Sequence, residues 1–399
     1  MIDTYVRRRP PVAPRRADGC DALAFHRMLP GYRRTALRRL DDLAEELGIG
    51  ELLVKDESSR LALPSFKILG ASWAIRRALG QRIALAPDES ITFADLRQRV
   101  QTLRPLTLAA ATDGNHGRAV ARMANMLGLG SRILVPHGTA AARVHAIEAE
   151  GAVVEVVAGS YDDAVRRSAE LSDRRCVVIS DTSWPGYEDV PRWVIDGYST
   201  ILCEVDDQLL EASLPGPDIV IVQMGVGAFA AAVARHAFRA GDQVTATVGV
   251  EPVAAACVLR SLCSCQITTL TAPQDSIMAG LNCGTPSLVA WPELVEHVDA
   301  ALAISDERAR DAMRALARSG VVAGESGAAG LAGLLALVSE DELEPIRREL
   351  KLGAQTRVLV FCTEGATDPV AYRDIVGAAA RDARDAVSAD DGRRSEINA

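Results

Sequence analysis

The chain has 399 residues, of which 48% are hydrophobic and 24% charged, the balance of a globular protein with a sizeable core and room for two domains. Its formal net charge of −9 argues against general binding to nucleic acid. The basic N-terminus is not followed by the apolar segment of a secretory signal, and the longest apolar run is too short to span a bilayer. We therefore expect a cytoplasmic protein without a membrane partner. Eight cysteines without a paired CxxC motif predict no metal site, and Cys257 and Cys283 are expected to be reduced.

Strands and helices are expected to alternate along most of the chain. Leucines at helical spacing predict an amphipathic helix over residues 34–47, followed by a short strand over 52–57. Ser65 is expected to cap the next helix, which holds Lys67 in its first turn, and residues 80–103 form a polar connection. Further strands are expected at 106–112, 132–136, 152–157, 176–180, 218–223, 244–251 and 357–362. Further helices are expected at 117–127, 140–150, 161–171, 191–210, 229–240, 305–319 and 326–338.

This alternation predicts the α/β class, with open and mostly parallel sheets flanked by helices. We expect a large domain formed by residues 1–85 and 191–380, a small domain formed by residues 86–190, and a disordered tail over residues 381–399. Open parallel sheets bind ligands at the carboxyl ends of their strands, so the loops that follow strands are the expected functional positions.

Lys67 is unusual in its residue type and in its setting. Only Lys55, Lys67 and Lys351 are lysines among the 44 basic residues, so arginine supplies most of the positive charge. Lys67 stands among apolar and small residues, where loss of water lets an amine lose its proton and attack a carbonyl, which arginine cannot do. A lysine whose stem packs on the helix while its ammonium stays in water accounts for the same pattern. This window by itself leaves both interpretations open.

Three loops that follow expected strands have sequences suited to ligand binding. The loop Thr-Asp-Gly-Asn-His-Gly at 112–117 opens a helix, so its backbone amides can bind an anion and Asn115 can donate to an oxygen. The loop at 223–229 contains Gly225 and Gly227, which let the backbone wrap a phosphate. In the loop at 362–368, the hydroxyl of Thr363 can hydrogen-bond a ring nitrogen without protonating it. An ordinary turn accounts for each loop taken separately.

A lysine in apolar surroundings, an oxygen donor, a phosphate loop and a terminal hydroxyl together fit an aldehyde cofactor with a phosphate group, which is pyridoxal 5′-phosphate. A nicotinamide oxidoreductase is an alternative, because Gly225-Val226-Gly227 begins like a dinucleotide fingerprint and Glu251 ends the next strand. Against this alternative, Ala230 stands where the third glycine of that fingerprint belongs.

Over about residues 30–375, the sequence resembles the fold-type II pyridoxal-phosphate enzymes, the tryptophan synthase β-like group, and within it the diaminopropionate ammonia-lyases. The resemblance is carried by Lys55-Asp56-Glu57, Ser65 to Gly70, Ala111 to Arg118, Asp181 to Tyr187, Met278 to Pro286, and Thr363-Glu364-Gly365. The stretches at Asp181 and Met278 favour the diaminopropionate ammonia-lyases over threonine dehydratases. The sequence departs from the pattern at Pro64, at Ala228-Phe229 in the glycine loop, and at Ala366, where these lyases more often have an acid.

The resemblance implies a two-lobed fold, a homodimer and a role for each matching residue. Lys67 would carry the cofactor as a Schiff base, Asn115 would contact its phenolic oxygen and Thr363 would face its pyridine nitrogen. Asp113 and Asp181 would lie near the substrate amines or the α-proton. The amides of the glycine loop would hold the phosphate: Gly225, Val226, Gly227, Ala228 and Phe229.

The implied reaction is the α,β-elimination of 2,3-diaminopropionate, a small amino acid, to pyruvate and two molecules of ammonia. A carboxylate beside the β-ammonium suits this substrate, because ammonia leaves readily only from a protonated amine. Threonine or serine dehydratases, β-replacement synthases and non-catalytic relatives that bind the cofactor are the alternatives. Asp113 as a helix cap and Asp181 as a turn residue remain open as structural interpretations.

Overall fold

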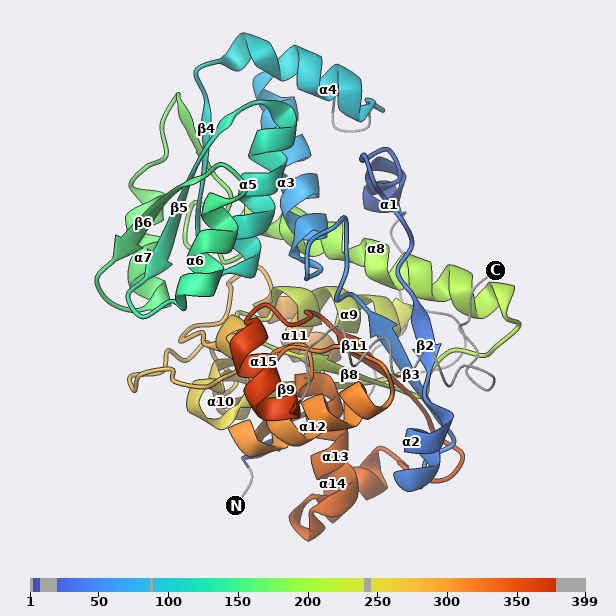
Figure 1. Ribbon diagram of the computed structural model, residues 1–399. Helices are drawn as coiled ribbons and strands as arrows, with labels where there is room; N and C mark the ends of the chain where they lie inside the picture. The colour runs from blue at the N-terminus through green and yellow to red at the C-terminus, as the bar shows by residue number, and fades with distance from the viewer. Residues whose placement is uncertain (1–2, 8–19, 87–88, 240–244, 378–399) are drawn as a thin grey trace.

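A computed structural model describes residues 3–7, 20–86, 89–239 and 245–377 of the chain. They form two sheets with helices on both faces (Figure 1). The larger sheet has the strand order β1-β10-β9-β8-β11-β3-β2 and the smaller sheet the order β6-β5-β4-β7. All strand pairs are parallel except β1 with β10 and β2 with β3, at the two edges of the larger sheet. The predicted α/β class with mostly parallel sheets is confirmed.

The strands of the larger sheet are β1 (Thr4–Val6), β2 (Leu37–Arg39), β3 (Glu51–Asp56), β8 (Ile219–Gln223), β9 (Ala246–Pro252), β10 (Ala300–Ile304) and β11 (Arg357–Cys362). The strands of the smaller sheet are β4 (Thr107–Ala111), β5 (Gly130–Pro136), β6 (Val153–Val157) and β7 (Cys176–Val178). The helices of the first half of the chain are α1 (Asp21–His26), α2 (Asp41–Glu46), α3 (Lys67–Arg82), α4 (Phe93–Arg99), α5 (Asn115–Leu127), α6 (Ala141–Glu148), α7 (Tyr161–Ala169) and α8 (Asp189–Glu211). The helices of the second half are α9 (Ala228–Arg239), α10 (Cys257–Ser264), α11 (Trp291–His297), α12 (Asp306–Arg318), α13 (Ala329–Ser339), α14 (Glu344–Glu349) and α15 (Pro369–Val376).

Both faces of the larger sheet are covered, which explains why β8 and β10 are buried at every position. Helices α3, α8 and α9 share one apolar core with both sheets, and α12 and α13 share another with the opposite face of the larger sheet. Helices α3 and α8 cross closely between the two sheets (Figure 1). At the crossing, a Cβ on Gly197 would lie 2.5 Å from the carbonyl oxygen of Leu69, so only glycine allows this approach.

Three expectations about the first hundred residues are wrong. The helix predicted over residues 34–47 is limited to α2, because Leu37 is buried by antiparallel pairing of β2 with β3. Ser65 does not cap α3; it forms a bridge with Glu364, and the cap position is Phe66. The connection at 80–103 contains α4, whose first turn is capped by Thr92, which accepts a hydrogen bond from the Asp95 amide.

The domain boundaries stay a proposal. Every strand of the smaller sheet lies between residues 107 and 178, inside the proposed small domain at 86–190. The predicted tail at 381–399 lies outside the described residues. In the described part of the chain, no helix is long and apolar enough to cross a membrane.

Candidate active site

One cavity lies at the carboxyl ends of strands from both sheets, the edge expected for a ligand site. Loops after β4 and β7 of the smaller sheet and after β8 and β11 of the larger sheet contribute to its wall, together with the start of α3. The wall includes every predicted site residue: Lys67, Asp113, Asn115, Asp181, Gly225, Val226, Gly227, Ala228, Phe229 and Thr363. The fold therefore brings together residues that are up to 296 positions apart, from Lys67 to Thr363.

Lys67 begins α3, and its ammonium donates a hydrogen bond to Oδ2 of Asp181 at 2.8 Å. The sequence predicted that loss of water would favour the neutral amine. Burial does lower the pKa of Lys67, but the charge of Asp181, the hydrogen bond to it and the charge of Asp113 outweigh burial and raise this pKa above its ordinary value of 10.5. In this arrangement, Lys67 is a protonated partner of Asp181.

Asp181 follows β7 and is ionised, although it is buried. Burial alone raises the pKa of this carboxyl, but the charge of Lys67 and hydrogen bonds from Lys67 and Tyr161 bring the pKa well below its ordinary value. The Tyr161 hydroxyl donates to Oδ1 of Asp181 at 2.9 Å. Tyr161 was not singled out from the sequence, where it is one more residue at the start of an expected helix.

Asp113 has the opposite electrostatic environment. Burial raises the pKa of its carboxyl to about 6, with a further contribution from the negative charges of Asp181 and Glu364. The positive charges of Arg143 and Lys67 oppose this shift without cancelling it. The two predicted carboxyls thus differ in proton affinity, and such a difference lets paired acids divide the roles of proton donor and acceptor.

The glycine loop between β8 and α9 has the form of a phosphate cradle. Gly227 has a φ of +89°, and a Cβ there would lie 2.5 Å from Leu294, so the turn requires glycine. Within the described residues, the amides of Gly225, Val226 and Gly227 have no hydrogen-bond acceptor. Unpaired amides at the start of a helix are suited to an anion.

Asn115 and Thr363 each have a buried polar partner that sequence reasoning missed. The side-chain amide of Asn115 donates to the carboxylate of Glu364, which also accepts from the Ser326 backbone amide at 3.1 Å. The side-chain amide of Gln223 lies 2.8 Å from the hydroxyl of Thr363. Glu364 adjoins Thr363 in the sequence, and Gln223 is the last residue of β8, so position next to a predicted ligand was the signal available for both.

His116, in the loop at 112–117, is buried and has a structural contact. Its Nε2 lies 2.8 Å from the carbonyl oxygen of Ile179, and burial lowers its pKa, which keeps the ring neutral.

Cys257 and Cys283 are both buried thiols, whereas Cys20 and Cys203 form a disulfide that joins the segment before α1 to α8.

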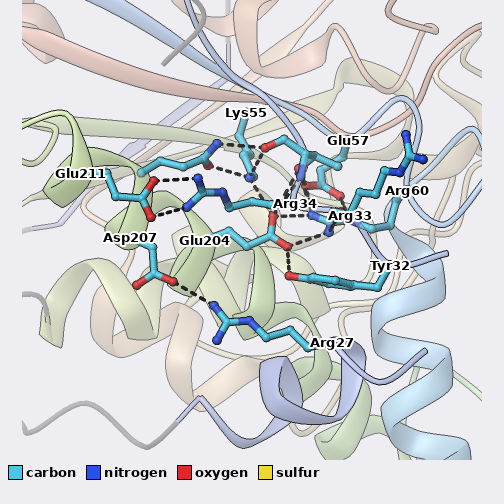
Figure 2. Close-up of polar contacts among 12 residues, drawn as sticks. Arg27, Tyr32, Arg33, Arg34, Lys55, Glu57, Arg60, Glu204, Asp207 and Glu211 are labelled. Carbon is cyan, nitrogen blue, oxygen red and sulfur yellow. Dashed lines mark hydrogen bonds and ion pairs between the residues drawn. The ribbon is translucent and has the colours of Figure 1, made fainter. Parts of the chain in front are cut away.

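The loop that connects β3 to Lys67 is held by a buried network of charges (Figure 2). Lys55 and Arg60 both contact Glu204 of α8, at 2.8 and 2.7 Å, and Arg60 also contacts Glu57 at 2.6 Å. All four side chains are fully buried, and the charges balance. Because Arg60 lies in this loop, the network fixes the path of the chain into α3.

Comparison with known proteins gives consistent matches. The sequence model of the family "pyridoxal-phosphate dependent enzyme" matches residues 28–352. Diaminopropionate ammonia-lyase from Salmonella typhimurium is 35% identical over 90% of this chain and 91% of its own length, and that from Escherichia coli is 36% identical over 89% and 90%. The crystal structure of holo diaminopropionate ammonia lyase from Escherichia coli superposes with a TM-score of 0.87 at 35% identity, over 94% of this chain and 96% of that one. The chain therefore belongs to the family of pyridoxal-phosphate-dependent enzymes and, within it, to the diaminopropionate ammonia-lyases.

Proposed function

We propose that this protein is a pyridoxal-phosphate-dependent ammonia-lyase that converts 2,3-diaminopropionate and one water to pyruvate and two molecules of ammonia. The observation that carries the proposal is the pair of carboxylates beside Lys67 in one cavity, Asp181 ionised and Asp113 with a pKa of about 6. A diamino acid presents two amines, and two carboxylates of different proton affinity suit the binding of one amine and the protonation of the other.

The residues present fit the cofactor. Lys67 supplies the amine, and the unpaired amides of the glycine loop would hold the phosphate. Asn115 would donate to the ring oxygen, and Thr363 would face the ring nitrogen. When bound, the cofactor withdraws electrons from the α-carbon of an amino acid and so makes its α-hydrogen acidic.

In the structure, Asp181 is paired with the Lys67 ammonium, and a Lys67 nitrogen that held the cofactor would leave this carboxylate free. Its carboxylate, held in place by the Tyr161 hydroxyl, would then accept the α-proton or hold a substrate ammonium. Asp113 would exchange a proton with the leaving β-amine, for which a pKa of about 6 is suitable. Cleavage of the carbon–nitrogen bond leaves the electron pair on nitrogen, so the amine must hold this proton when it departs.

Pyruvate release from a panel of amino acids tests the proposal. We expect turnover of 2,3-diaminopropionate to exceed that of serine and threonine, and the variant Asp181→Asn to lower turnover of 2,3-diaminopropionate by about 10²–10⁴-fold, the usual contribution of a general acid or base. Turnover of serine, whose leaving hydroxyl needs no ammonium-binding carboxylate, should fall much less. Equal losses on both substrates would contradict the ammonium-binding role of Asp181 and leave it the role of α-proton acceptor. Turnover of serine or threonine above that of 2,3-diaminopropionate would favour the dehydratase alternative, and a protein without turnover would favour the non-catalytic one.

The family match excludes the nicotinamide oxidoreductase considered from Gly225-Val226-Gly227. The homodimer and the cytoplasmic location stay predictions. Light scattering of the purified holoenzyme at several concentrations tests the first, and localisation of the expressed full-length chain tests the second.

A further inference from the structure

Gln223 connects the glycine loop to Thr363 below the cavity. It is the last residue of β8, its side chain is buried, and it forms part of the cavity wall. Its Nε2 atom lies 2.8 Å from Oγ1 of Thr363, 3.0 Å from the carbonyl oxygen of Ser326 and 3.1 Å from that of Phe361. The carbonyl oxygen of Gly327 lies 3.4 Å from the same nitrogen, so one amide group meets four oxygens that come from two different segments of the chain.

The orientation of the Gln223 amide is set by these neighbours. Backbone carbonyl oxygens only accept hydrogen bonds, so the group that faces those of Ser326 and Phe361 must be the NH₂ group. A flipped amide would place lone pairs against lone pairs at both positions. The amide oxygen of Gln223 consequently points elsewhere and is a buried atom without a hydrogen-bond partner in the described part of the chain.

This orientation determines what the Thr363 hydroxyl can do. An amide nitrogen has no lone pair to offer, so the hydroxyl can only accept where it meets Gln223. Its single hydrogen must point in another direction. The Thr363 hydroxyl has no hydrogen-bond acceptor of its own among the described residues, and Thr363 lines the cavity.

We propose that Gln223 is a positioning residue that makes the Thr363 hydroxyl a hydrogen-bond donor to the ring nitrogen of the cofactor, which keeps that nitrogen unprotonated. The inference rests on the role proposed above for Thr363. A neutral ring nitrogen withdraws less charge from the α-carbon than a pyridinium does, so the negative charge that develops there is relieved by departure of the β-amine. Gln223 thereby favours elimination over reactions that need long-lived charge on the ring, such as transamination.

The direct test is the ¹⁵N chemical shift of the ring nitrogen in holoenzyme loaded with ¹⁵N-labelled pyridoxal phosphate. The wild-type protein should show the shift of a neutral, hydrogen-bonded pyridine. In Gln223→Met, which has similar length and no donor, the Thr363 hydroxyl is free to turn and accept, so the signal should move toward that of pyridinium. Thr363→Ser, which keeps the hydroxyl, should match the wild type.

A second measurement is the amount of pyridoxamine phosphate formed per pyruvate released from 2,3-diaminopropionate. We expect Gln223→Met to raise this ratio about tenfold, the factor given by loss of one ordinary hydrogen bond. Thr363→Val should raise it too, and adding Gln223→Met to Thr363→Val should change it no further, because Gln223 acts through that hydroxyl.

A pyridinium shift in the wild type would overturn the inference, even if Gln223→Met does not fold. So would an unchanged shift in a folded Gln223→Met holoenzyme. The nitrogen shift needs only the bound cofactor. A protein that shows the neutral shift and the expected response to Gln223→Met, but does not release pyruvate from 2,3-diaminopropionate, would contradict the proposed substrate and leave this inference standing.

Discussion

Replacing Glu204 with alanine is expected to destabilise the protein strongly, because it removes one of the two carboxylates in the buried network that precedes Lys67. Arg60 would keep its contacts with Glu57, at 2.6 and 2.8 Å. Lys55 would keep only the uncharged oxygens of Thr35 and Gln208 and would have lost its carboxylate at 2.8 Å. A fully buried ammonium without a counter-charge typically costs about 3–5 kcal/mol of stability, which is a factor of about 10²–10⁴ in the folding equilibrium.

The assay is urea unfolding of the holoenzyme, followed by far-ultraviolet circular dichroism at fixed protein and cofactor concentrations. Glu211→Ala is a matched control, because Glu211 is on the same helix and pairs with Arg34 at 2.6 Å where both side chains are partly exposed. This variant should lose about 0–1 kcal/mol. Glu204→Gln, which keeps the shape and one acceptor, should lie between the two. If Glu204→Ala and Glu211→Ala cost the same, the network does not provide the stability that its burial implies.

Three further predictions concern the site and the disulfide. Since Asp113 is assigned the proton for the leaving amine and its pKa is raised to about 6, its acidic form is lost as pH rises through that value, and kcat/KM for 2,3-diaminopropionate should fall with it in wild type but not in the residual activity of Asp113→Asn. Glu364→Ala should weaken cofactor binding about 10–100-fold in a spectrophotometric titration, because Asn115 loses a charged acceptor, whereas Glu364→Gln should lose less. Cys20→Ser should lower stability by about 2–4 kcal/mol, since the bond to Cys203 closes a loop of 183 residues, and dithiothreitol should then have no further effect on thermal unfolding.

Most of the fold could be predicted because the period of apolar residues matches the elements that form. β11 has the bounds expected from the sequence, and the other predicted strands agree to within a few residues, whereas β1, β2 and β10 were not predicted. The error at residues 34–47 has a physical cause: Leu37 and Leu40 fit a helix by spacing, but pairing of β2 with β3 gives Leu37 a buried position that an isolated helix cannot offer. The spacing of leucines within residues 34–47 carries no information about β3, the strand that pairs with β2.

In the site, too, features that depend on neighbouring residues in the sequence could be predicted, and features that depend on tertiary contacts could not. Lys67, Asn115 and Thr363 could be found because each stands in a loop or helix start with a recognisable sequence. The pKa of Lys67 could not, because its direction depends on a carboxylate 114 positions away, which only the fold brings to 2.8 Å. Gln223 could not be identified as a functional residue from the sequence either, because its four acceptor oxygens come together only in the fold.

The ion pair of Lys67 with Asp181 affects how the protein binds its cofactor. The same nitrogen could not both hold this carboxylate as an ammonium and hold the cofactor, so binding of the cofactor would release Asp181. Without the cofactor, the carboxylate is therefore neutralised by Lys67 and is not available to a substrate. Linked equilibria are reciprocal, so neutralising Asp181 should ease attachment of the cofactor even as it slows turnover. The negative charge of Asp181 therefore weakens binding of the cofactor and at the same time supports turnover.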